Sequence, residues 1–291
     1  MTHTGRQFVF VPGSVDLDTA GWNPQTIHIV NRNNPDDNHR IVNIDETITA
    51  LRCNDTFAIA STAMGHLKIV SLSTGTEVFK SDKIWTDGGA AFDCCFGISE
   101  TLICFGAEGN QGVLRVATFN NDIAAPEVKG LSKCDTKGGK MRCVTISEDG
   151  TMVACADEQG VYAYVASVGE AKVFKTFTRG SSAAKVLALR FSPRGEFLAL
   201  MSDHGTCHLF GVAPGISNYI GFWGYVWSHE ESKLYGDKDI SRCAIGVDCN
   251  SDTSFKVLML DSKLGGVDSD VLVSEGKLKF SGESKFTVTL N

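Results

Sequence analysis

The sequence lacks any long apolar run. No stretch approaches the roughly 18 consecutive apolar residues that a membrane-spanning helix requires, and Met1–Gln7 lacks the apolar core of a secretory signal. Of the 291 residues, 43% are hydrophobic and 21% are charged, which is typical of a soluble globular protein. We therefore expect a cytoplasmic protein with a substantial core.

Signatures of catalysis and of metal binding are also missing. The chain has no C-x-x-C, no G-x-S-x-G, no H-E-x-x-H and no Cys/His group with zinc spacing. The glycine-rich stretch GAEGNQG at 106–112 lacks the GK[ST] ending of a phosphate loop and predicts a hairpin turn. We expect no enzyme activity, no cofactor and no metal. Five of the ten cysteines lie in apolar runs and predict free, buried thiols in a reducing compartment: Cys104, Cys143, Cys155, Cys207 and Cys243.

Positive charge is scarce. The 27 Lys and Arg residues are outnumbered by 34 Asp and Glu, which gives a net charge of −7 and a pI near 5.5. This balance argues against nucleic acid as a partner, because nonspecific binding to phosphate backbones needs a basic surface. One basic segment, which contains no acid, interrupts the pattern between Ala171 and Gly195: Lys172, Lys175, Arg179, Lys185, Arg190 and Arg194.

Helical periodicity is almost absent, and short period-2 runs bounded by turn residues recur instead. Two segments, VTISEDGTMVACADEQGVYAYVA (144–166) and LRFSPRGEFLALMSDHGTCHLFG (189–211), align without gaps at a spacing of 45 residues. A repeat of this length with about four strands indicates a β-propeller blade. Six blades are recognisable within a single predicted domain, 1–291. A two-sheet sandwich is the alternative, and the regular period of the repeats argues against it. The blades start near Gln7, Ile48, Ala90, Met141, Lys185 and Arg242.

The stretch FTRGSSAAKVLALRFSPRGEFLALMSDHGTCHLFGV (177–212) resembles the PROPPIN family, although the Trp-Asp pair of ordinary WD40 repeats is absent. The resemblance implies an all-β, WD40-like propeller of the seven-bladed family type. It also implies binding to phosphatidylinositol 3-phosphate and 3,5-bisphosphate. The protein would be a scaffold that associates peripherally and reversibly with membranes in autophagy or endosomal traffic, together with protein partners of that machinery.

The resemblance further implies two headgroup pockets. The second pocket has suitable residues throughout: Arg179, Gly180, Ser202, Thr206 and His208. The first pocket has lost the family's first arginine, and an acid and a valine stand among its remaining positions, so we expect it to be degenerate: Thr178, Cys155, Asp157, Val161 and Tyr164.

The chemistry of the second pocket follows from its residue types. An arginine fork bonds phosphate oxygens in pairs, and alternation places Thr206 and His208 on the same face of one strand. Three alternatives stay open. Arg179 could be a solvated cation whose substitution changes stability by only about 0.5 kcal/mol. Thr206 and His208 could be a structural pair, with Asp203 and His204 forming the turn. The whole protein could be a peptide-binding scaffold that has lost lipid binding.

The segment after this pocket, Gly211–Trp227, is rich in aromatic and aliphatic residues. By resemblance, Ile216, Tyr219 and Ile220 form a membrane-insertion loop. From Phe222 onward we expect the fourth strand of the blade instead.

Overall fold

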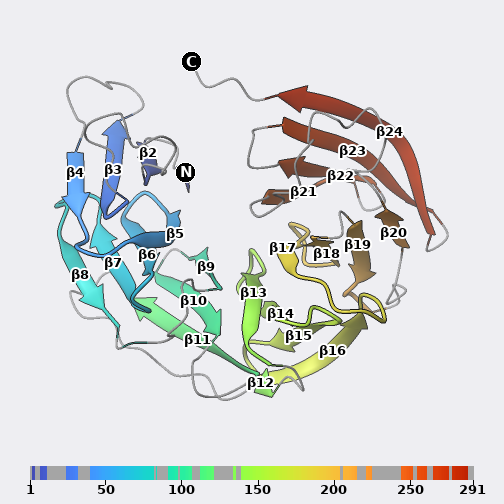
Figure 1. The fold of residues 1–291 in the computed structure, drawn as a ribbon, viewed down its shortest axis with the longest axis horizontal. Coiled ribbons are helices and arrows are strands. Elements are labelled where there is room, and N and C mark those ends of the chain that lie inside the picture. Colours follow the sequence, from blue (N-terminus) through green and yellow to red (C-terminus); the bar gives the residue numbers. More distant parts are fainter. Residues whose placement is uncertain are drawn as a thin grey trace. The chain divides into compact units, whose positions relative to one another are not determined.

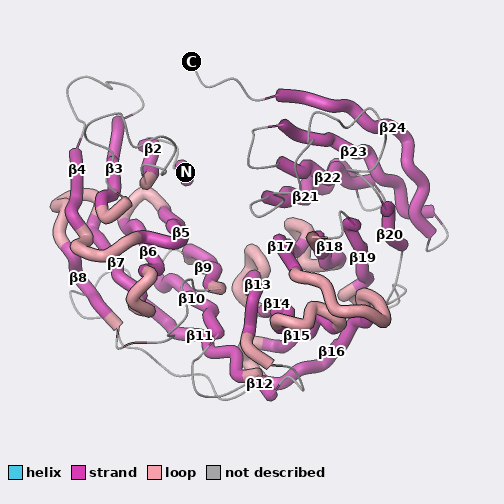
Figure 2. The backbone as a smooth tube through the Cα atoms, in the orientation of Figure 1, coloured by secondary structure: helices cyan, strands magenta, loops and turns pink. Residues whose placement is uncertain are grey.

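In the computed structural model, every regular element among the described residues is a β-strand (Figure 2). The structure describes residues 2–3, 7–11, 24–31, 40–81, 83, 91–97, 99–106, 112–120, 134–135, 139–203, 206–214, 221–224, 244–251, 254–260, 265–274 and 277–287. Within these ranges no helix is long and apolar enough to cross a membrane.

The 24 described strands form six antiparallel sheets of four strands each, seen as separate groups in Figure 1. The first sheet contains β1 (Thr2–His3), β2 (Gln7–Phe10), β3 (Thr26–Asn31) and β4 (Arg40–Asn43). The second contains β5 (Ile48–Cys53), β6 (Phe57–Thr62), β7 (Leu67–Ser71) and β8 (Glu77–Lys80). The third contains β9 (Phe92–Phe96), β10 (Glu100–Gly106), β11 (Val113–Asn120) and β12 (Cys134–Asp135).

The other three sheets repeat this meander. The fourth contains β13 (Met141–Ile146), β14 (Met152–Asp157), β15 (Tyr162–Ser167) and β16 (Lys172–Thr178). The fifth contains β17 (Val186–Phe191), β18 (Phe197–Ser202), β19 (Thr206–Gly211) and β20 (Gly221–Gly224). The sixth contains β21 (Ala244–Ser251), β22 (Ser254–Leu260), β23 (Gly265–Ser274) and β24 (Lys277–Thr287).

The sheets confirm the six predicted blades and exclude a two-sheet sandwich. Each sheet is one blade, with its strands hydrogen-bonded in chain order. The first blade begins earlier than expected, because β1 pairs with β2 through Thr2 and Val9. Residues Met1–Arg6 are mostly polar and carry no alternation, so the sequence pattern gave no sign of this short strand.

The first strand of three blades carries a β-bulge at its start. The register shifts between Ile48 and Ala50 in β5, between Met141 and Cys143 in β13, and between Val186 and Ala188 in β17. A bulge adds one unpaired residue and changes the parity of the strand around it. In all three blades the pair before the shift joins the first residue of the strand to the last residue of its neighbour, as in Val186 with Ser202.

The chain forms two compact units, and each has its own apolar core. Met1–Asn110 and Arg115–Gly130 make the first, and Gln111–Leu114 and Leu131–Asn291 make the second. In the first unit one cluster lies around the β1–β8 region and another around β6, β7 and β9–β11. In the second unit the core joins the fourth and fifth blades, where Phe177 stacks on Phe210 with ring centroids 4.8 Å apart.

The cysteines described are free thiols, as predicted: Cys53, Cys94, Cys95, Cys104, Cys143, Cys155 and Cys207. Cys104, Cys155 and Cys207 are buried, whereas Cys143 is half-buried. Burial raises the pKa of Cys94 well above its ordinary value, which keeps that thiol protonated. Cys243 lies outside the described residues.

Gly160 occupies the turn between β14 and β15 with φ +58°, a backbone conformation that favours glycine. A Cβ atom added there would lie 2.0 Å from the carbonyl oxygen of Ala184. The turn is therefore packed directly against the segment that leads into the next blade.

We predict that Gly160→Ala destabilises the protein by about 2 kcal/mol or more, because it combines a strained φ with a backbone clash. Gly169→Ala is the matched control: its Cβ would meet nothing within 4 Å, so we expect a change within about 0.5 kcal/mol. Urea denaturation of both variants checks this. Equal stability of the two would contradict the packing described for the turn.

Candidate functional site

The candidate site is built on the turn from Asp157 to Gly160. The Asp157 carboxylate is buried, and its Oδ1 accepts a hydrogen bond of 2.8 Å from the Gly160 backbone N–H. This bond holds the turn in shape, as short acidic side chains commonly do. The carbonyl of Gly160 is thereby directed to a partner on the chain that follows β16.

That partner is Arg179, whose side chain is only 8% exposed. Its Nε donates to the Gly160 carbonyl at 2.6 Å, and one terminal nitrogen donates to the Ser182 carbonyl. Its backbone N–H donates to the Val161 carbonyl at 2.8 Å. The interpretation of Arg179 as a solvated surface cation is therefore wrong. Its removal would leave buried carbonyls without donors, which costs about 1–3 kcal/mol rather than the small amount typical of a surface residue.

The guanidinium of Arg179 keeps donors available. An arginine has five N–H groups, and two of them serve the two carbonyls; the other three have no hydrogen-bond acceptor among the described residues. Burial lowers the pKa of Arg179, while the charge of Asp203 acts in the opposite direction. The group remains a cation at neutral pH, because the ordinary pKa of an arginine is far above that range.

His208, on β19, is 5% exposed and lies close enough to Arg179 for their charges to interact. Burial, and then the charge of Arg179, lower the pKa of His208 to about 4, so the ring is neutral at pH 7. The ring lies nearly parallel to that of Phe210, with centroids 6.2 Å apart, and its Nδ1 is buried with no hydrogen bond. The described contacts thus fix the plane of a neutral imidazole beside a cation.

Phe177 explains why an aromatic residue precedes the Thr-Arg-Gly sequence. Its ring stacks on the Phe210 ring, and the Lys175 ammonium lies 5.9 Å from the Phe177 centroid. Lys175 Nζ also donates to the Gly211 carbonyl at 3.0 Å, and burial lowers its pKa. These contacts fasten the end of β16 to β19. Phe177 therefore positions Arg179, a role that residue type alone did not indicate.

The other predicted members of the second pocket lie on the same blade or next to it. Ser202 is fully buried at the end of β18, opposite Val186. A Cβ at Gly180 would meet nothing within 4 Å, so space is open beside the backbone there. Thr206 begins β19, but its side chain lies outside the described residues, as does His204. Asp203 forms a turn, as predicted: its Oδ1 accepts from the Lys185 N–H at 3.0 Å.

The residues of the first pocket also gather on one blade. Cys155 and Tyr164 are paired across β14 and β15, and both are buried. Burial, and then the charge of Asp157, raise the pKa of Tyr164, which places the phenol near that carboxylate. Thr178 is exposed at the end of β16, opposite Tyr162. Tyr162 is the first residue of β15, and Thr206 is the first residue of β19, so the two occupy equivalent positions in their blades. Val161, predicted as a member of the first pocket, precedes β15.

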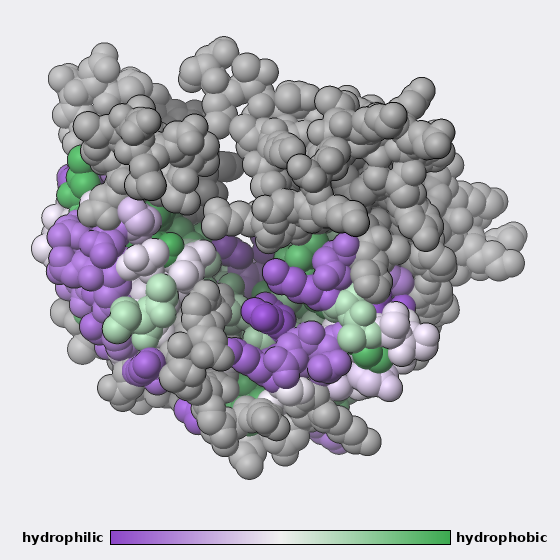
Figure 3. All heavy atoms as spheres, in the orientation of Figure 1, coloured by the Kyte–Doolittle hydropathy of each residue, from purple (hydrophilic) through white to green (hydrophobic). Residues whose placement is uncertain are grey.

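The possible membrane-insertion residues, Ile216, Tyr219 and Ile220, lie outside the described residues. The expected fourth strand is present as β20, whose Trp223 and Phe222 pair with Cys207 and His208. Within the described ranges, no three His, Cys, Asp or Glu residues form a group that could hold a metal ion. On the face shown in Figure 3, hydrophilic side chains predominate among the coloured residues, and apolar ones form small separate groups.

Comparisons with known proteins relate this chain to a set of fungal and amoebal proteins. It is 36% identical over 97 residues to SVP1-like protein 2 of Candida glabrata, which covers 33% of this chain and 22% of that protein. It is 27% identical over 191 residues to SVP1-like protein 2 of Kluyveromyces lactis, covering 61% and 55%. It is 29% identical over 130 residues to autophagy-related protein 18 of Dictyostelium discoideum, covering 44% and 33%. No family model matches.

Solved structures give the fold. Kluyveromyces lactis Hsv2 superimposes with a TM-score of 0.69 at 18% identity, over 89% of this chain and 80% of that one. The structure described as a complex of KlAtg21 with the coiled-coil of AgAtg16 gives 0.66 at 12% identity, over 92% and 79%. These comparisons support the predicted resemblance to the PROPPIN family. The fold is a WD40-like β-propeller like that of the solved structures, with six blades among the described residues.

The matches of this chain to the curated relatives are partial. The matched segments span from about a fifth to about a half of those relatives' lengths. The segment with Thr178 and Arg179 falls in the fourth blade of this chain, and its buried arginine is at the junction with the fifth.

The neutral state of His208 makes the stability of this protein depend on pH. The unfolded ring, with a pKa of 6.5, takes up a proton below that pH, whereas the folded ring does so only near pH 4. The stability that the neutral ring contributes is thus complete above pH 6.5 and is lost between pH 6.5 and 4.

We predict that the wild type loses about 2 kcal/mol more stability than His208→Gln when the pH falls from 7 to 5. Glutamine has no proton to take up in this range, so the variant lacks this component of the pH dependence. Urea denaturation at both pH values measures the difference. Parallel losses in the two proteins would show that the folded ring titrates normally.

Proposed function

We propose that this protein binds the headgroups of phosphatidylinositol 3-phosphate and 3,5-bisphosphate through one site, and that it acts as a membrane-recruited scaffold in autophagy or endosomal traffic. The site comprises Arg179, Gly180, Ser202, Thr206 and His208. The observation that supports the proposal is a buried arginine of fixed orientation. Three of its N–H donors have no acceptor among the described residues.

The carbonyls of Gly160 and Ser182 fix the plane of the Arg179 guanidinium before any ligand arrives. A phosphate monoester accepts hydrogen bonds from the remaining donors, and charge-assisted bonds of this kind are about twice as strong as neutral ones. The dianion offsets the effect of Arg179 on His208 and favours protonation of the ring. Open space beside Gly180 admits the headgroup to the backbone.

The first pocket does not take part in this proposal. Its arginine position is Thr178, and Asp157, which caps Gly160, adds a buried carboxylate that would repel a phosphate. A single site lowers avidity for a membrane compared with two sites on one rigid domain. Association with membranes is therefore peripheral and readily reversible.

Protein partners complete the proposed role. The solved complex of KlAtg21 with the coiled-coil of AgAtg16 supports a partner from the autophagy machinery. The competing function is a peptide-binding scaffold without lipid affinity, which the loss of the first arginine favours. The proposal assigns no catalytic step to the chain.

Liposome flotation with phosphatidylinositol 3-phosphate tests the site. We expect Arg179→Lys, which keeps the charge but loses the fork, to weaken binding about tenfold or more. Gly180→Ala should weaken binding without loss of stability, because its methyl group fills the open space beside the backbone.

Lys172→Ala is the control for loss of a positive charge outside the site, since Lys172 is exposed at the start of β16. It should bind almost as well as the wild type, and added salt should weaken binding in both, because screening acts over about 8 Å at physiological ionic strength. Equal flotation of Arg179→Lys and wild type would refute the site. Absence of binding by the wild type would favour the peptide scaffold.

The number of sites gives a second test. Calorimetry with the soluble headgroup inositol 1,3-bisphosphate should show one site in the wild type. Combining Thr178→Arg, Asp157→Asn and Tyr162→Thr should raise this number toward two. Asparagine keeps the oxygen that accepts from Gly160 and removes the opposing charge.

The second site should increase liposome binding more than binding of the soluble headgroup, because the second contact is intramolecular. Asp157→Asn alone, which supplies no arginine, is the control and should stay at one site. Two sites in the wild type would show that the first pocket is functional.

A further inference from the structure

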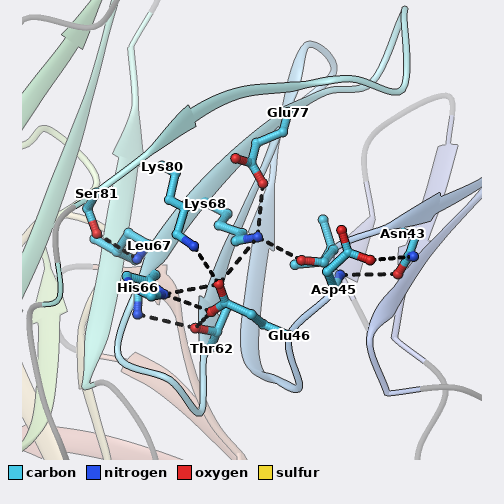
Figure 4. Close-up of polar contacts among 11 residues, drawn as sticks. Asn43, Asp45, Glu46, Thr62, His66, Leu67, Lys68, Glu77, Lys80 and Ser81 are labelled. Atoms are coloured by element: carbon cyan, nitrogen blue, oxygen red, sulfur yellow. Dashed lines mark hydrogen bonds and ion pairs between the residues drawn. The ribbon is translucent and has the colours of Figure 1, made fainter.

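A single carboxylate in the second blade accepts hydrogen bonds from three side chains and forms an ion pair with a fourth (Figure 4). Glu46, just before β5, receives the Thr62 hydroxyl at 2.5 Å and His66 Nδ1 at 2.9 Å on Oε2. Its Oε1 lies 2.8 Å from Lys80 Nζ and 3.5 Å from Lys68 Nζ. A hydroxyl, an imidazole and two ammonium groups thus converge on one anion.

The carboxylate is tightly held. Glu46 and Lys68 have side chains only 10% and 6% exposed. Burial by itself would raise the pKa of Glu46, but the bonds from Lys80, Thr62 and His66, with the charge of Lys68, lower it to about 2. Lys68 is further fixed by the Ile44 carbonyl at 2.7 Å and by Glu77 at 3.1 Å. Lys68 therefore keeps its position through contacts other than Glu46.

The same backbone frame recurs in the fifth blade. In the second blade, Ile48 pairs with Thr62, and the Ala63 N–H donates to the Thr47 carbonyl at 2.8 Å. In the fifth, Val186 pairs with Ser202, and the Asp203 N–H donates to the Lys185 carbonyl at 2.9 Å. Thr62 and Ser202 thus occupy equivalent positions, and both are buried hydroxyls.

The third strands agree with this equivalence. Lys68 pairs with Ala60, two residues before Thr62, and His208 pairs with Leu200, two residues before Ser202. Lys68 and His208 are therefore equivalent, and both are buried nitrogen donors. Glu46, two residues before β5, corresponds to Ala184, two residues before β17. Where the second blade has its own carboxylate, the fifth has a methyl group.

The fourth blade gives a third version. The Glu158 N–H donates to the Lys140 carbonyl at 2.9 Å, and Met141 pairs with Asp157. The hydroxyl position is thus the acid Asp157, and the position of Glu46 is Gly139. Asp157 takes the place of a hydroxyl donor, so this position of the fourth blade has no hydrogen-bond donor for an anion.

We propose that the residue two positions before the first strand decides whether a blade's anion site is open. In the second blade, Glu46 is a built-in ligand that closes a site able to take a phosphate monoester. In the fifth blade, Ala184 leaves the equivalent site open; this second half rests on the proposed function, whereas the first half does not.

Glu46→Ala tests the first half, with inorganic phosphate and inositol 1,3-bisphosphate as probes. Calorimetry should show one more site than in the wild type, and phosphate should raise the Tm of the variant more than chloride of equal ionic strength does. Glu46→Gln is the control, because its amide still fills the site; it should gain no site. Adding Lys68→Met to Glu46→Ala should remove the gain.

A variant Glu46→Ala that folds in phosphate but not in chloride also supports the proposal. A variant with no additional site and no phosphate-specific gain in folding or stability overturns it. Liposome flotation separates the sources: binding of free phosphate without added flotation assigns the opened site to soluble phosphates, and added flotation assigns it to the lipid headgroup.

Ala184→Glu tests the second half. It places a carboxylate where Glu46 stands in the second blade, and binding of inositol 1,3-bisphosphate should fall at least tenfold. Ala184→Gln, with the same shape and no charge, should lose clearly less, and urea denaturation should show both variants folded to the same degree. Equal losses in the two variants would overturn this half. If the wild type binds no headgroup, the proposed function fails, and the Glu46 experiment still decides the first half.

Discussion

The hydrogen bond from Arg179 to the Gly160 carbonyl is the interaction on which the candidate site depends. It exists because Asp157 shapes the turn that presents this carbonyl and because Gly160 has no side chain to push Ala184 away. A long cationic side chain normally samples many rotamers. Here backbone carbonyls of neighbouring segments remove that freedom. The geometry of a turn in the fourth blade therefore orients the Arg179 guanidinium at the junction with the fifth blade.

Much of the fold could be predicted from the sequence, because blades repeat and repetition makes weak local signals add up. The alternation in β13–β15 and β17–β19, with glycines at fixed offsets, located these strands closely. The short strand β1 was missed because two polar residues have no period to detect. Arg179, Ser202 and His208 could also be named as candidate site residues from the sequence, since strand parity determines which residues share a face.

The energetic state of those residues could not be predicted in the same way. The burial of Arg179 depends on the Gly160 and Ser182 carbonyls, and no local sequence pattern shows that both carbonyls meet its side chain. The role of Phe177 depends on Phe210, 33 residues later, in another blade. The Glu46 cluster was missed for a similar reason: its donors come from three strands, and none of them forms a local motif.

The bulge at the start of β5, β13 and β17 has a consequence for how such a protein diverges. Because a bulge adds one unpaired residue, the alternation of side chains before it does not fix which side chains behind it face inward. Residues ahead of the bulge can then change in size or charge while the inward-facing side chains behind it keep their places. Each of these three blades thus combines a variable lead-in segment with a constant core, and recognition can change in one of them while the other blades fold as before.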